Sequence, residues 1–208
     1  TDGSEVEPND DWATANLMPF DRPFEGAGPG TDRILFVVGA EQAGRAWDLQ
    51  VESEANLRID IVDPDGRVVQ SRRGAAGTLP SLVFKEGTYG LHLQPEEAPY
   101  TLTFRDAGAL PGDGMEREPN DVLAVATPMS EELTLRGNLA AQDTDVVSFF
   151  IEGEPGLYRI QAIGEGIETL ASLDGGGASQ GQVRGDRRLR LDNLALAPGL
   201  QFVRIEGE

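Results

Sequence analysis

Apolar residues recur along the chain in short runs that partly alternate with polar residues, and these runs are rich in Val, Ile and Leu. Runs of about four to eight such residues, bounded by Gly, Pro, Asn and Asp, predict β-strands. No stretch of 12 residues has the apolar period of an amphipathic helix, so we expect at most one helical turn at 9–15 and another at 120–126. The predicted strands cover residues 33–38, 46–53, 56–62, 67–71, 81–84, 88–93, 100–104, 146–152, 157–163, 168–173, 188–196 and 201–206.

The same series of predicted strands occurs twice along the chain. The sequence Glu-x-Glu-Pro-Asn-Asp stands at 5–10 and again at 116–121, a shift of 111 residues, and the same shift places Trp47 on Tyr158. A repeat of this length indicates two copies of one domain. We therefore predict an all-β protein of two tandem antiparallel β-sandwich domains, residues 1–108 and 116–208. The linker is 109–115, within the Gly-rich stretch 106–115.

The second copy ends before the counterpart of the strand at 100–104. We expect the chain to be a fragment of a longer protein in which this last strand follows. The alternative is a second copy that lacks the strand altogether. A lost strand would leave an open sheet edge, which is a liability for pairing with other strands.

Acidic residues dominate the charge of the chain. The net charge is −19, with 17 basic and 36 acidic residues, and it is shared between the two halves. This argues against nucleic acid as a partner and favours the uptake of divalent cations. Cysteine is absent, so no disulfide, thiolate metal site or Cys nucleophile exists, and no apolar run of 18 residues suggests a transmembrane helix.

The repeated acidic segments are the main candidate site. In an extended segment Glu5 and Glu7 point the same way, and Asn9 and Asp10 add further oxygens. Calcium prefers six to eight oxygen ligands and tolerates irregular geometry, so it would offset the repulsion between these carboxylates. Alternatively, Asn9 and Asp10 cap a helical turn, or the acids are plain surface. The candidates in the second copy are Glu116, Glu118, Asn120 and Asp121.

Several features together resemble the bacterial pre-peptidase C-terminal domain family, to which the collagen-binding domains of clostridial collagenases are related. These are Glu-Pro-Asn-Asp followed by Ala-x-Ala, an Asp before a strand, Asp-Pro-Asp-Gly at 63–66, Gly-Thr-Tyr at 87–89 and a closing Tyr strand. The resemblance implies a jelly-roll-like β-sandwich in a secreted, periplasmic or cell-surface protein.

The resemblance also implies a non-catalytic role in adhesion, secretion or stability. The partners it implies are a protein, an extracellular-matrix or cell-surface polymer, or adjacent domains of a longer chain. The acidic segment and a downstream Asp loop would bind calcium. In the second copy this loop supplies Asp143 and Asp145, whereas the first copy offers only Asp32, with Gly30 or Ile34 at the other position.

Other motifs favour structural interpretations. Gly-Ala-Ser-Gln-Gly at 177–181 matches a nucleophile elbow, but that site needs a histidine later in the chain, and the one histidine, His92, precedes it. His92 alternates with Leu91 and Leu93, as a solvent-facing strand residue would. Asp-Pro-Asp-Gly at 63–66 is typical of a turn, and Arg-Gly-Asp at 184–186 of a turn that carries arginine. Two alternatives to an accessory module remain: a carbohydrate-binding module, and a hydrolase that uses paired carboxylates such as Asp143 and Asp145.

Overall fold

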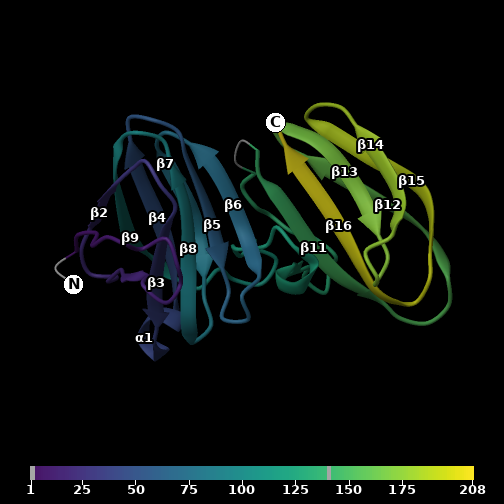
Figure 1. The fold of residues 1–208 in the computed structure, drawn as a ribbon. Coiled ribbons are helices and arrows are strands. Elements are labelled where there is room, and N and C mark those ends of the chain that lie inside the picture. The colour runs from purple at the N-terminus through teal and green to yellow at the C-terminus, as the bar shows by residue number, and fades with distance from the viewer. Residues whose placement is uncertain (1–2, 140–141) are drawn as a thin grey trace. The chain divides into compact units, whose positions relative to one another are not determined.

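The computed structural model describes residues 3–139 and 142–208, and strands make up most of them (Figure 1). This confirms the prediction of an all-β fold. The described helical segments are α1 (Ala40–Ala43) and one 3-10 turn, η1 (Leu123–Val125). Neither is long and apolar enough to cross a membrane. The backbone divides into two compact units, one up to Pro111 and the other from Gly112 onward.

The first unit contains two sheets. One has the strand order β1-β3-β8-β5-β6 and the other β2-β9-β4-β7 (Figure 1). All pairings are antiparallel except that of β1 with β3. The strands are β1 (Asn16–Leu17), β2 (Phe24–Ala27), β3 (Asp32–Val38), β4 (Arg45–Ser53), β5 (Leu57–Val62), β6 (Val68–Gly74), β7 (Gly77–Val83), β8 (Gly87–Pro95) and β9 (Pro99–Ala109).

Alternation along the strands places one apolar face of each sheet in the core of this unit. In β3, Ile34, Phe36 and Val38 are buried, whereas Val37 between them is 54% exposed. Phe36 lies at the centre of an aromatic cluster, and its ring centroid is 5.0–5.8 Å from those of Phe20, Phe84, Tyr89 and Phe104. Edge-to-face and offset ring pairs of this kind add to the stabilisation that burial provides.

The second unit repeats the first sheet in the same order, β10-β11-β16-β13-β14, again with one parallel pair, β10 with β11. Among the described residues, its other sheet consists of β12 and β15, which correspond to β4 and β7. The strands are β10 (Thr127–Pro128), β11 (Thr144–Ile151), β12 (Gly156–Ile163), β13 (Ile167–Leu173), β14 (Ser179–Arg184), β15 (Arg188–Leu196) and β16 (Gly199–Gly207).

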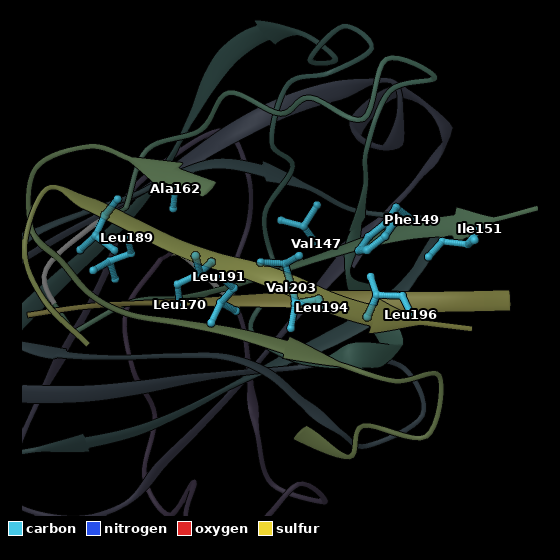
Figure 2. Packing of buried hydrophobic residues seen from close by; sticks show 11 residues of the cluster. Val147, Phe149, Ile151, Ala162, Leu170, Leu189, Leu191, Leu194, Leu196 and Val203 are labelled. Carbon is cyan, nitrogen blue, oxygen red and sulfur yellow. The ribbon is translucent and has the colours of Figure 1, made fainter. Parts of the chain in front are cut away.

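The core of the second unit is built from aliphatic side chains of both sheets. Figure 2 shows Val147 of β11, Leu170 of β13 and Val203 of β16 near Leu191 and Leu194 of β15. Phe149 is the one aromatic residue among the buried members of this cluster. The two sheets therefore enclose a core without the aromatic cluster of the first unit.

Local details differ from the sequence predictions at a few places. Ala109, the first residue of the predicted linker, belongs to β9, because it pairs with Arg45 of β4; nearby, Asp106 forms an ion pair with Arg45 at 2.6 Å. His92 lies on the face opposite the buried Leu91 and Leu93, as predicted, but it is half-buried there, with Nδ1 3.5 Å from Asp60 Oδ2. Helix α1 was not predicted, since four residues carry no helical period.

The turn at 63–66 is confirmed. Asp63 Oδ1 accepts from the backbone of Asp65 at 3.0 Å and Arg67 at 2.8 Å, and Gly66 adopts a φ of 81°. A side-chain oxygen that accepts from the amide two residues on forms an Asx-turn.

Candidate metal sites

In the first unit, three carboxylates converge where the acidic lead-in runs beside the start of β3. Oxygens of Glu5, Glu7 and Asp32 lie within 4.8 Å of one another. The backbone holds the lead-in there, because Arg33 N donates to Asn9 O at 3.0 Å and Glu5 N donates to Glu25 O at 2.8 Å. The expectation that Glu5 and Glu7 point the same way is confirmed.

Asn9 organises this group from within. Its Nδ2 donates to Glu5 Oε1 at 2.6 Å and its backbone N donates to Glu7 Oε2 at 3.0 Å. Asn9 is fully buried, and its Oδ1 has no hydrogen-bond partner among the described residues. A helix cap would use that oxygen to accept from the following turn, so the capping interpretation of Asn9 is wrong.

The second unit builds the same arrangement from its own lead-in. Glu116, Glu118 and Asp145 have oxygens within 4.8 Å of one another. Asn120 donates from Nδ2 to Glu116 Oε1 at 3.1 Å and from its backbone to Glu118 Oε2 at 2.9 Å. The side-chain oxygen of Asn120 accepts from Val146 N at 3.4 Å and caps no helix.

The second cluster is the more deeply buried of the two. Glu116, Glu118 and Asp145 are 8%, 3% and 5% exposed, whereas Glu5 is half-buried and Glu7 exposed. Burial removes water that would otherwise solvate the charges, so the unfavourable energy of ionised carboxylates, which a cation would offset, is larger here. Asp145 Oδ1 is buried and has no hydrogen-bond partner among the described residues.

The structure decides which downstream acid belongs to each cluster. Asn16 pairs with Ile34 in the first unit and Thr127 with Val147 in the second, so the shift of 111 residues becomes 113 in β3 and β11. Asp32 is therefore the counterpart of Asp145. Three other predicted ligands lie outside the three-carboxylate groups: Asp10, Asp121 and Asp143.

Residues that the sequence analysis missed hold both lead-ins in place. Asn16 exchanges side-chain hydrogen bonds with the backbone of Val6 at 3.0 and 3.1 Å, and Thr127 does the same with Arg117 at 3.2 and 3.0 Å. Asn16 and Thr127 occupy equivalent positions under the shift of 111. That equivalence was the available signal, but the differing residue types concealed it.

Burial and neighbouring acids raise the pKa of several of these carboxyls. Burial, together with Asp143, Glu116 and Asp121, raises the pKa of Glu118 to about 9. The pKa of Asp145 is raised by burial and then by Glu116. Burial also raises the pKa of Asp32, but a hydrogen bond from Tyr100 opposes that increase.

Chemically, each cluster is a set of oxygens with surplus negative charge. Such a set suits a hard cation, which favours carboxylate and amide oxygens over nitrogen or sulfur. The carboxylates are closer together than the ~5–9 Å that separates the two acids of glycoside hydrolases. Asp145 lies within the cluster, close to Glu116 and Glu118.

The remaining motifs lie apart from both clusters. Ser179 begins strand β14, which leads through a turn into β15, so the strand–turn–helix setting of a nucleophile elbow is absent from this described segment. The Arg-Gly-Asp residues at 184–186 are exposed in that turn. Trp12 is 41% exposed and lies against Arg33, whose guanidinium carbon is 4.8 Å from the ring centroid.

No protein family and no curated protein matches the chain by sequence. Among solved structures, a protein assigned as secreted, from Eubacterium rectale, aligns with 89% of this chain and 67% of its own, at 8% identity and a TM-score of 0.27. The PBSX exported protein XepA aligns with 91% of this chain and 88% of its own, at 11% identity and a TM-score of 0.25. Likeness at this level supports no conclusion about function.

Proposed function

We propose that the chain is a non-catalytic accessory module of an exported bacterial protein, in which calcium fastens each acidic lead-in to its β-sandwich. The proposal rests on one observation: the same three carboxylates and the same organising asparagine recur in both units at equivalent positions. The resemblance to pre-peptidase C-terminal domains supports the accessory role and a location outside the cytoplasm.

The repulsion within each cluster requires a compensating charge. Two carboxylates about 4 Å apart repel by about 1 kcal/mol in water and by several kcal/mol at lower dielectric. The charged groups that raise the pKa of Glu118 are all acids: Asp143, Glu116 and Asp121. Protons supply the missing charge at low pH, and a divalent cation supplies it at neutral pH.

Calcium fits the available donors better than a smaller ion does. Glu116, Glu118 and Asp145 come from two separate segments, and Asp145 Oδ1 is a buried acceptor without a donor among the described residues. Calcium accepts irregular arrangements of six to eight oxygens, whereas magnesium demands a near-ideal octahedron. A bound ion would join the lead-in to β11, much as a disulfide joins two segments.

An accessory role follows from what the site would do. An ion held among buried carboxylates stabilises a scaffold, which then presents a surface to a protein or to an extracellular-matrix or cell-surface polymer, or supports a neighbouring domain. The proposed module turns over no substrate. Incubation with a panel of peptides and glycans tests this, because any hydrolysis would refute the non-catalytic assignment.

The test of calcium binding is a titration of EDTA-treated protein, followed by calorimetry and by thermal unfolding. We expect dissociation constants of about 10⁻⁴ to 10⁻³ M, as in extracellular calcium modules. Calcium at 100-fold excess over that constant then stabilises the folded unit by about 2.7 kcal/mol. Magnesium at the same concentration serves as the ion control.

The variant Glu118→Gln should lose the calcium effect in the second unit. Glu154→Gln, which removes one charge from an exposed loop outside the clusters, is the matched control and should keep it. If calcium and EDTA both leave the melting temperature of the unaltered protein unchanged, the calcium proposal is wrong.

A further inference from the structure

The two units differ at one strand position. In the first unit, β9 lies between β2 and β4 and pairs with both. In the second unit, β12 corresponds to β4, but β15 is its one partner among the described residues. The edge of β12 that faces away from β15 therefore presents unpaired backbone groups, which are strong hydrogen-bonding groups.

The other neighbour of the vacant position is also present. Residues 135–138 correspond to β2 under the shift of 111. Asn138 N donates to Glu116 Oε2 at 2.6 Å, as Ala27 N does to Glu5 Oε2 at 2.8 Å. The parallel bridge of Met115 with Arg136 likewise repeats that of Ser4 with Glu25. The two segments that flank β9 in the first unit therefore both have counterparts in the second unit, namely residues 135–138 and β12.

Between these two segments lies a cavity of about 510 Å³. Its lining includes Leu135 and Gly137 on one side, Ile160 and Ala162 of β12 on the other, and Val203 of β16. We call this cavity the strand slot. It coincides with the position that residues 100–104 fill in the first unit, where Leu102 pairs with both Phe24 and Val51.

A polar feature identifies the chemistry of the missing strand. Tyr100 of β9 is 2% exposed, and its hydroxyl donates to Asp32 Oδ2 at 2.8 Å. Asp145, the counterpart of Asp32, lines the strand slot, and its buried Oδ1 has no hydrogen-bond partner among the described residues. A tyrosine at the equivalent position would supply the donor that Asp145 lacks.

The glycines beside the slot agree with this assignment. In β2, a Cβ at Gly26 would clash with the Tyr100 hydroxyl, so glycine leaves room for the tyrosine. Gly137 stands at the equivalent position in the second unit and lines the slot. An added Cβ at Gly137 would also meet the Glu116 carboxylate, just as one at Gly26 would meet that of Glu5, so both glycines leave room for the acidic lead-in as well.

We propose that the strand slot is an acceptor site for one extended peptide strand that runs antiparallel to β12. The strand carries a tyrosine that donates to Asp145 and apolar residues two and four positions later, in the pattern of Tyr100, Leu102 and Phe104. Main-chain hydrogen bonds to β12 provide affinity and the alternate side chains provide specificity, as in other cases of β-strand addition.

The occupant is a peptide strand from outside residues 3–208, not a second copy of the chain. The β9 strand of another copy is already paired on both edges with β2 and β4. Two copies joined edge to edge through β12 would pair backbone groups but would leave the cavity unfilled and Asp145 without a donor. The proposal does not require calcium, because main-chain pairing with β12 needs no ion, but Asp145 belongs both to the strand slot and to the second cluster.

The test uses the full chain and a synthetic peptide with the sequence of residues 99–107, measured by hydrogen exchange and by calorimetry. We expect slowed exchange of the β12 amides and unchanged exchange in β4. A peptide with phenylalanine in place of its tyrosine should bind about tenfold more weakly or worse, because a hydrogen bond to a buried carboxyl group is lost. A peptide of scrambled order should not protect β12.

A second experiment joins the strand covalently to the chain, so that its result does not depend on how tightly a free peptide binds. The same nine residues are joined after Glu208 through two residues, so that Glu208 and these two reproduce the three-residue connection between β8 and β9. The joined strand should protect β12, and the scrambled one should not. If β12 exchanges equally fast in both arms, the proposal is wrong. It is also wrong if light scattering shows a dimer that protects β12 without peptide.

Discussion

The raised pKa values in the second cluster predict an unusual dependence of stability on pH. An acid whose pKa is higher in the folded state holds its proton there at a pH where the unfolded chain has lost it. Its contribution to stability is therefore fully present below the unfolded pKa and is lost as the pH rises through the folded one. For Glu118 the window runs from 4.5 to about 9.

The size of the effect follows from the same values. A pKa that moves from 4.5 to about 9 corresponds to at most about 6 kcal/mol of unfolding free energy across the window. Relaxation and water entry reduce this, so we expect a loss of several kcal/mol in EDTA between about pH 5 and pH 9. Asp145, with its raised pKa, acts in the same direction.

Calcium should abolish this loss, because it replaces the protons with a cation that binds the ionised carboxylates. Its stabilising effect should accordingly grow with pH, and binding at neutral pH should release protons. Two carboxyls with lowered pKa values, Asp106 and Asp192, act in the opposite sense. Their contribution is lost only as the pH falls below about 4, so they do not obscure the window.

The assay is urea unfolding at a series of pH values, with and without calcium. Trp12 and Trp47 both belong to the first unit, so tryptophan fluorescence reports on that unit, and hydrogen exchange in β11 and β16 reports on the second. Glu118→Gln should reduce the loss of unfolding free energy with rising pH in EDTA, and Glu154→Gln should not. A stability that is constant or rises between about pH 5 and pH 9 in EDTA would refute the reasoning.

Three further changes test the packing of the structure by urea unfolding. Tyr100→Phe removes the donor to the buried Asp32 and should destabilise the first unit by about 2 kcal/mol, with no change in the second. Phe36→Ala empties the centre of the aromatic cluster and should cost about 3–5 kcal/mol; a smaller loss would show that the rings collapse into the space. Arg159→Ala breaks an exposed ion pair with Asp192, so the urea midpoint should stay the same within error, and a clear decrease would contradict the assignment of this pair as a surface contact.

Much of the fold could be predicted because strands are encoded locally. Alternation of apolar and polar residues has the period of the pleat, so Ile34, Phe36 and Val38 mark one buried face without knowledge of their partners. The repeat at a shift of 111 likewise needs only a comparison of the chain with itself.

The candidate site was predicted in part. Glu5 and Glu7 were paired correctly because residues two apart in an extended segment share a side. The choice of Asp145 over Asp143 was left open, since the repeat slips by two residues between the lead-in and β11, and only the pairing of β10 with β11 measures that slip. The role of Asn9 was also left open. An asparagine side chain can cap a helical turn or hold two carboxylates, and the sequence does not distinguish these roles.

Local pattern thus settled the strands, the repeat and the acidic lead-ins, because each depends on residues that are close along the chain. The tertiary structure decided which acids meet, how deeply they are buried, and that β12 has one vacant edge beside a cavity. These properties depend on pairings such as Asn9 with Arg33, or Tyr100 with Asp32, between residues far apart in sequence. Burial and charge coupling arise only when such segments come together, so no pattern within one segment can encode them.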